Sequence, residues 1–166
     1  MPSILTSLAA AMPGMPAGSW WLAPLVLLLL GITAVTDGFK GRVPDAIIVP
    51  GLFVLVAIQG LLVDWNFAGK HLAFGFGFAI ALYLVNQGWY LWRKHDGIGM
   101  GDAKWSALAV AAFGIGPGLI AWFLGAWVAV AWIAIAHALQ KKIERVHFAP
   151  FLFFGLVAGI YYLRFR

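Results

Sequence analysis

The chain contains no cysteine, which excludes disulfides and any zinc or iron–sulfur site built from cysteine thiolates. It is also short of charge, because Asp, Glu, Lys and Arg together make up 10% of its 166 residues, whereas soluble domains carry about 25%. The first 19 residues have no charged side chain, so they lack the basic segment that opens a secretory signal peptide. We interpret residues 1–19 as an uncleaved tail, and the low charge as excluding a water-soluble domain.

Apolar residues take the place of the missing charges. They form 63% of the chain, and the mean hydropathy is +0.93. A transmembrane helix needs about 20 apolar residues, so about six would use most of the chain and leave only short loops. The sequence predicts an all-α, polytopic membrane protein in which residues 1–166 form a single integral membrane domain. The expected spans are 20–36, 46–63, 72–92, 102 to 114–118 (ended by Pro117), 119–139 and 148–163.

The basic residues sort by side of the membrane. Of the 11 Lys and Arg residues, eight lie in or beside the loops after the first, third and fifth spans, and three lie on the opposite side. Because cytoplasmic loops carry the excess of Lys and Arg, we expect those three loops in the cytoplasm and both termini, with the tail, outside it. The basic residues form no stripe of the kind that binds nucleic acid, so the net charge of +5 does not predict a nucleic-acid partner.

The acidic residues are few enough to consider singly. Four of the six have ordinary interpretations as surface, loop or helix-capping residues: Asp45, Asp64, Asp96 and Glu144. The other two, Asp37 at the end of the first span and Asp102 at the start of the fourth, are expected at the same membrane face. Two carboxylates that meet there suit acid–base chemistry, because they cannot both ionise easily. The alternative is structural, with Asp102 as a helix cap and Asp37 as a helix-end residue, and spacing alone leaves both open.

Three glycines at alternate positions, in the segment Gly97-Ile-Gly-Met-Gly101, directly precede Asp102. Glycine allows close backbone approach and positive φ, and we expect the segment (here the glycine segment, residues 97–101) to admit an extended peptide beside a carboxylate. A phosphate site is the competing interpretation, and it is disfavoured because Asp102 occupies the helix end where the anion would sit.

Three motifs carry a family resemblance. The segment Gly99-Met-Gly-Asp102-Ala-Lys104 resembles the GxGD signature of intramembrane aspartyl peptidases, and its GMGDxK form is most similar to the type IV prepilin peptidases. In that family an earlier aspartate is followed by basic residues and a proline, as in the segment from Asp37 to Pro44-Asp45 here. The segment 147–152 is similar to the family's PFGPFL motif, with departures at His147 and Ala149.

The resemblance implies an aspartyl endopeptidase that removes short basic leaders from prepilins or pseudopilins, after a glycine, at the cytoplasmic face of the bacterial inner membrane. It implies that Asp37 and Asp102 are the catalytic pair, and we expect Gly99, Gly101, Lys104, Pro44 and Asp45 to support the substrate or the loops. We predict no metal and no cofactor, with membrane lipid as the other partner; the sequence does not indicate an oligomeric state. Because the chain lacks the zinc-binding cysteines of larger members, it looks like the peptidase-only branch that serves Flp/Tad pili, without N-methyltransferase activity.

Several alternatives stay open at this point. A presenilin-like protease is one, although that group has a Tyr-Asp motif and Thr36 precedes Asp37 here. A small proton- or cation-coupled transporter that uses Asp37 and Asp102 is another, although no inverted repeat is evident. Lys104 is interpreted as binding a substrate carbonyl or a lipid headgroup, or simply as a snorkelling helix-end residue. Asn86 and Gln87 are interpreted mainly as hydrogen-bonding residues between helices, and alternatively as lining the site from the third span. His137 is interpreted as a packed helix-end residue and His95 as an ordinary loop residue.

Overall fold

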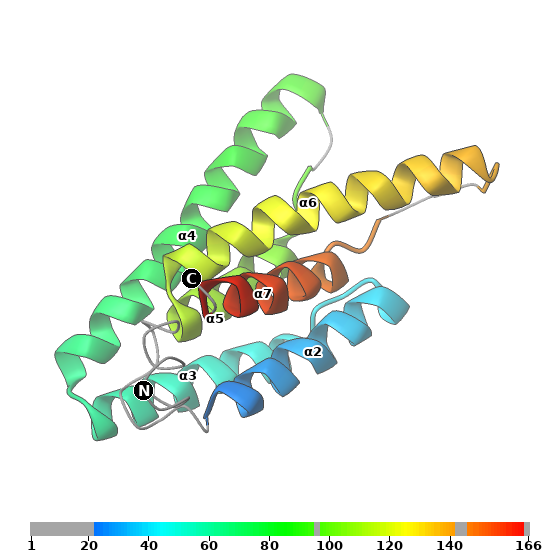
Figure 1. The fold of residues 1–166 in the computed structure, drawn as a ribbon. Coiled ribbons are helices and arrows are strands. Elements are labelled where there is room, and N and C mark those ends of the chain that lie inside the picture. The colour runs from blue at the N-terminus through cyan, green and yellow to red at the C-terminus, as the bar shows by residue number, and fades with distance from the viewer. Residues whose placement is uncertain (1–21, 95–96, 142–145, 165–166) are drawn as a thin grey trace.

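The computed structural model describes residues 22–94, 97–141 and 146–164 of the chain. These residues form six α-helices, and no strand occurs among them, which confirms the prediction of an all-α protein (Figure 1). The helices are α2 (Leu22–Lys40), α3 (Asp45–Leu62), α4 (Trp65–Arg93), α5 (Met100–Phe113), α6 (Ile115–Ala138) and α7 (Ala149–Arg164). The tail at 1–19, His95, Asp96 and Glu144 lie outside the described residues.

Four of the described helices, α2, α3, α4 and α6, are long and apolar enough to cross a membrane, and α7 is a shorter apolar helix. Their outer faces expose large apolar side chains, among them Leu28, Phe53 and Phe123, which are more than half exposed. A water-soluble protein rarely exposes apolar patches of this extent, whereas a surface that faces the hydrocarbon core of a bilayer is expected to be apolar. The polytopic membrane fold is therefore confirmed.

The remaining helix, α5, lies at the centre of the bundle and contacts all five of the other described helices. Eleven of its 14 residues are buried, including Trp105, Leu108 and Phe113. Two polar side chains also bind it to its neighbours. The indole N–H of Trp105 donates to the carbonyl of Leu30 at 3.1 Å, and Nε2 of Gln59 donates to the carbonyl of Ala111 at 3.1 Å. Such bonds satisfy polar groups that would be costly to bury unpaired.

Two helix boundaries depart from the predicted spans for identifiable reasons. Helix α4 begins seven residues early because Asp64 caps it, with its carboxylate accepting from the backbone N–H of Phe67 at 2.8 Å. The break between the fourth and fifth spans lies at Gly114, whose φ of 87° suits glycine. The prediction that Pro117 ends the fourth span is wrong. Pro117 lies in the first turn of α6, where its missing N–H costs nothing.

Glycines in α7 allow this helix to pack closely against α6. A Cβ on Gly155 would overlap the carbonyl oxygen of Ala121, and a Cβ on Gly159 would lie 2.8 Å from Cγ2 of Ile120. The Gly155-to-Gly159 pattern therefore serves helix packing within the chain, as small residues commonly do between membrane helices.

Replacing Gly155 by valine is expected to destabilise the protein by at least about 1–3 kcal/mol, because overpacking forces the backbones of α6 and α7 apart. Thermal unfolding in detergent measures the effect. Gly77→Val, within α4, is the matched control, because nothing lies within 4 Å of a Cβ at that position. Equal unfolding temperatures for the two variants would contradict the packing argument.

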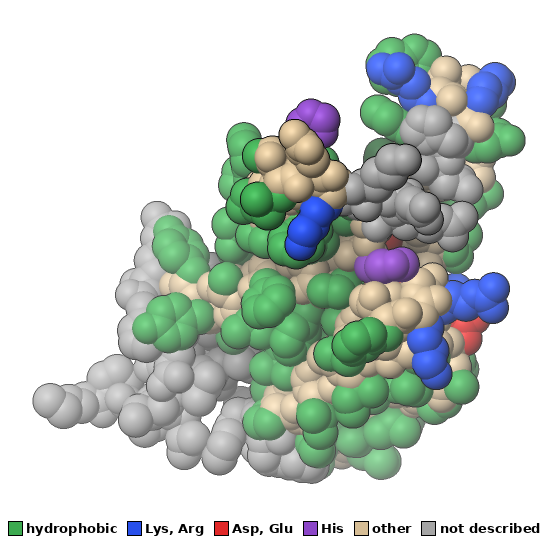
Figure 2. Space-filling view, turned by 90° about the vertical axis from the view of Figure 1, so that its right-hand side faces the viewer, with side chains coloured by type: hydrophobic (Ala, Val, Ile, Leu, Met, Phe, Trp, Pro, Cys, Tyr) green, Lys and Arg blue, Asp and Glu red, His purple; other side chains and the backbone are tan. Residues whose placement is uncertain are grey.

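One end of the bundle collects the ends of α2, α4 and α6 and the starts of α3, α5 and α7. In Figure 1 this end faces the right and the top, where α4 ends. Figure 2 looks onto this end and shows Lys, Arg and His side chains around it. Six of the eight basic residues that the sequence groups on one side lie here, namely Lys40, Arg42, Arg93, Lys94, Lys104 and Lys141. The basic residues that the sequence groups on one side are therefore found together at one end of the folded bundle.

Candidate active site

Asp37 and Asp102 meet at the basic end of the bundle. Asp37 lies in the last turn of α2 and Asp102 in the first turn of α5, and their residues are 7% and 9% exposed. The two carboxylates are close enough to interact electrostatically. Both line the same two cavities, of about 780 and about 290 Å³. The fold therefore brings two acidic residues that are 65 positions apart in the sequence to the same cavities.

The side chain and backbone of Asp102 are held from two directions. Its carboxylate accepts a hydrogen bond from the backbone N–H of Gly99, the residue that caps α5. Its carbonyl accepts from the hydroxyl of Ser106 at 2.7 Å, and that hydroxyl accepts from the indole N–H of Trp122 at 2.8 Å. Asp102 is thus not the helix cap, as one interpretation had it. It is the third helical residue and reaches back to the cap, as acidic side chains do in a capping box.

Asp37 is held by the start of α7. Its carboxylate accepts from the backbone N–H of Ala149, the first residue of that helix, and interacts electrostatically with His147. The first N–H groups of a helix have no partner within the helix and favour negative charge. The segment 147–152, which resembles the family's third motif, is therefore what supports Asp37.

Gly41 makes room for His147 beside Asp37. Its φ is +64°, and a Cβ there would lie 2.8 Å from Cε1 of His147. Both the conformation and the close contact exclude larger residues. The turn after α2 and the start of α7 consequently fit together at the carboxylate.

The larger cavity has one polar wall and one apolar wall. Asp37, Asp102 and the glycine segment form the polar wall, together with His147. Helix α6 supplies the apolar wall through Trp122, Ala126, Ala129, Val130 and Ile133. A cavity of about 780 Å³ is large enough for several residues of a peptide, since ligand sites span about 300–1,000 Å³.

The glycine segment allows close approach, as predicted, but the expected positive φ is absent from its three glycines. A Cβ on Gly97 would lie 2.9 Å from Cδ1 of Trp89, one on Gly99 would lie 3.0 Å from Oδ2 of Asp102, and one on Gly101 would lie 3.0 Å from Cγ2 of Val43. Each glycine thus makes space for a neighbour that belongs to, or lies beside, the site.

Pro44, Asp45 and Lys104 form a link beside the carboxylates. Pro44 is the N-cap of α3, and Asp45 is the first residue of that helix. Both carboxylate oxygens of Asp45 accept from Nζ of Lys104 at 2.8 Å, and the two side chains are 61% and 41% exposed. Asp45, Lys104 and Gly101 line the smaller cavity with both acids. The ion pair ties the start of α3 to the start of α5.

Lys104→Met is expected to lower the cleavage rate by no more than about fivefold, because an exposed ion pair contributes about 0–1 kcal/mol. Asp45→Asn is expected to have the same effect, and the double variant to be no worse than either single variant. Initial rates of the three variants measure this coupling. A loss with Lys104→Met far larger than with Asp45→Asn would instead assign Lys104 a direct contact with the substrate.

Asn86 supplies a further polar contact to the site. The favoured interpretation places this residue between helices, but its Oδ1 accepts from two backbone N–H groups of the glycine segment, which is closer to the alternative that it lines the site. The only signal in the sequence is an amide side chain near the end of an apolar span. Over the described ranges, no three His, Asp or Glu side chains gather as metal ligands.

The fold and the site together define a multi-pass helical membrane protein with two buried carboxylates facing cavities at one end. Residues 24–163 match the model of Peptidase A24, the type IV leader peptidase family. The chain belongs to this family, whose members are aspartic endopeptidases of the bacterial inner membrane, and membership implies cleavage of prepilin leader peptides. No curated protein and no solved structure matches the chain.

Proposed function

We propose that Asp37 and Asp102 are the catalytic pair, and that the protein cleaves basic leaders from prepilins at the cytoplasmic face of the membrane. The observation that carries the proposal is the convergence of the two buried carboxylates, from α2 and α5, on shared cavities. The cytoplasmic orientation is supported by the basic residues at the same end of the bundle.

The proposed reaction is attack of water on the scissile carbonyl without a covalent intermediate. One ionised carboxylate takes a proton from the water, whose oxygen bonds to the carbonyl carbon. The other, protonated carboxylate donates its proton to the carbonyl oxygen. Collapse of the tetrahedral intermediate breaks the C–N bond, and a proton passes to the leaving amine. A pair of interacting carboxylates suits this division, because the charge on one opposes ionisation of the other.

The other predicted residues have supporting roles in this proposal. Gly99 leaves space for the carboxylate of Asp102, and Gly101 lets the turn before α3 approach α5. Pro44 starts α3, and the pair of Asp45 with Lys104 fixes that start against α5. We further propose that residues 1–166 act as one membrane domain with residues 1–19 outside the cytoplasm.

We also propose that this protein is a peptidase of the Flp/Tad-pilus type without N-methyltransferase activity. The support is the absence of cysteine, which leaves no thiolate ligands for the zinc-binding segment of larger members. Prepilins or pseudopilins and membrane lipid are its proposed partners.

Purified protein in detergent, incubated with a prepilin whose leader ends in glycine, tests the proposal. With S-adenosylmethionine supplied as methyl donor, mass spectrometry of the products is expected to show cleavage after that glycine and no methyl group on the new N-terminus. The alternative, a proton- or cation-coupled transporter, predicts an intact prepilin together with proton flux into liposomes. The position of the acids at one end of the bundle favours the peptidase, because transporter sites lie near the bilayer midplane.

A further inference from the structure

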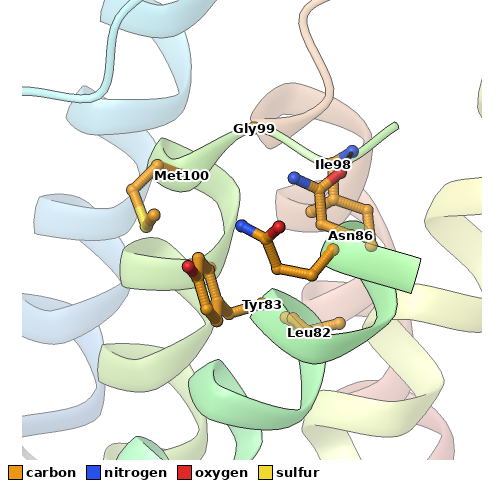
Figure 3. A pocket seen from close by; sticks show the side chains of 8 residues that line it. Leu82, Tyr83, Asn86, Ile98, Gly99 and Met100 are labelled. Atoms are coloured by element: carbon orange, nitrogen blue, oxygen red, sulfur yellow. Dashed lines mark hydrogen bonds between the residues drawn. The ribbon is translucent and has the colours of Figure 1, made fainter. Parts of the chain in front are cut away.

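One side chain of α4, that of Asn86, binds the backbone of the glycine segment. Oδ1 of Asn86 accepts from the backbone N–H groups of Gly97 and Ile98, each at 2.8 Å. Figure 3 shows the Asn86 side chain directed toward Ile98, with Gly99 next along the chain. Asn86 therefore connects a long membrane helix to the segment that leads into α5.

The next N–H of the segment, that of Gly99, donates to the carboxylate of Asp102. The backbone N–H groups of residues 97, 98 and 99 thus have side-chain acceptors. The amide oxygen of Asn86 on α4 accepts from the first two, and the carboxylate of Asp102 on α5 accepts from the third. Each peptide unit is planar, so once the first two N–H groups are fixed only φ and ψ of Ile98 set the direction of the third. Gly99 is thus one residue away from backbone that Asn86 holds.

The segment also separates two hollows. On one side, Ile98 and Gly99 line the larger cavity, which also contains Asp37 and Asp102. On the other side they line a cavity of about 180 Å³, to which Leu82, Tyr83 and Asn86 also contribute (Figure 3). Apart from the close approach of Gly97 to Trp89 and of Gly99 to Asp102, the two cavities leave this backbone with few packing contacts. Its hydrogen bonds to Asn86 therefore carry more of its positioning than they would in a packed core.

We propose that Asn86 is a positioning residue of the active site, whose Oδ1 holds residues 97–99 so that Gly99 orients the carboxylate of Asp102. The inference rests on the proposed catalytic role of Asp102. Asn86 acts through the backbone of the glycine segment and not on the substrate.

The test compares three variants with matched folded yield, judged by size-exclusion profile and thermal unfolding in detergent. Asn86→Ala is expected to lower kcat for prepilin cleavage about 10- to 100-fold, because small misplacements of a reacting group have effects of this size. Asn86→Asp keeps an acceptor oxygen at the same place and is expected to restore most of the activity. Gln87→Ala changes the neighbouring amide on the same cavity and is expected to cleave like the wild type.

Hydrogen exchange supplies a second readout. Asn86→Ala is expected to speed exchange at the amides of residues 97 and 98 while the amides of α4 and α5 stay protected. If Asn86→Ala does not fold, Asn86→Gln replaces it, since its oxygen lies one methylene further out and a loss of about tenfold is expected.

Two results would overturn the inference while leaving the proposed function intact. One is wild-type activity in Asn86→Ala, or in Asn86→Gln where that variant stands in. The other is equal inactivity of folded Asn86→Ala and Asn86→Asp, which would show that the acceptor oxygen is not what matters. An inactive wild-type protein, by contrast, would contradict the proposed function itself.

Discussion

Asp37→Asn and Asp102→Asn are each expected to abolish detectable prepilin cleavage, with a rate loss of at least about 10²–10⁴-fold, the contribution of general acid–base catalysis. The amide keeps the shape of each side chain but can neither take a proton from water nor donate one to the carbonyl. Because both carboxylates act in the same step, the double variant is expected to be no worse than either single variant. Rates of leader release by purified variants measure the effect.

Asp64→Asn is the matched control for these substitutions. Asp64 caps α4 at the opposite end of the bundle, and asparagine caps helices about as well as aspartate, so both stability and activity are expected to be unchanged. All variants are compared by unfolding temperature. Full activity of Asp37→Asn, or of Asp102→Asn, would refute the catalytic pair.

Gly99→Val is expected to lower cleavage about 100-fold or more while the bundle stays folded. The backbone at Gly99 has φ −70° and ψ 141°, a conformation open to any residue, so the expected effect comes from space alone. A Cβ would lie 3.0 Å from Oδ2 of Asp102, and the branched side chain would push the carboxylate away from the Gly99 N–H. Displacement of a reacting group on this scale costs about two orders of magnitude.

Gly88→Val controls for adding a branched side chain near the end of α4, since nothing lies within 4 Å of a Cβ there. It is expected to cleave at the wild-type rate. The kinetics separate the effect on the substrate from the effect on Asp102, because a lost carboxylate position lowers kcat, whereas a narrowed cavity raises KM. An unchanged kcat in Gly99→Val would show that Asp102 does not depend on this glycine.

The convergence of Asp37 and Asp102 could be predicted because it depends only on counting spans. Each apolar run reverses the direction of the chain, so the end of the first span and the start of the fourth fall at the same face. The grouping of the basic residues depends on the same alternation of spans. The described ones lie at the end of the bundle that holds the loops after the first, third and fifth spans, as predicted. Hydropathy alone locates the apolar spans, and the spans in turn decide which residues lie at each face of the membrane.

What the sequence could not predict depends on contacts between distant segments. Asn86 binds a loop and not a helix because α4 extends past the start of α5, which no local pattern indicates. The support of Asp37 by Ala149 and His147 needs the start of α7 to lie against the end of α2. The start of α5 at Met100 depends on Gly99 and Asp102 bonding to each other, so the helix begins two residues before the acid that seemed to cap it.

Helix α5 has a consequence for how the protein is made. Its 14 residues span about 21 Å, less than the roughly 30 Å of a bilayer core, and it carries Asp102 and Lys104, so it is a poor candidate for insertion on its own. Gly114 joins it directly to α6, and we expect the two to enter the membrane together as a hairpin. Asp37 in turn lacks its partner N–H until Ala149 has been synthesised. The contacts that hold Asp37 are therefore complete only once the start of α7 has been synthesised and packed against the end of α2.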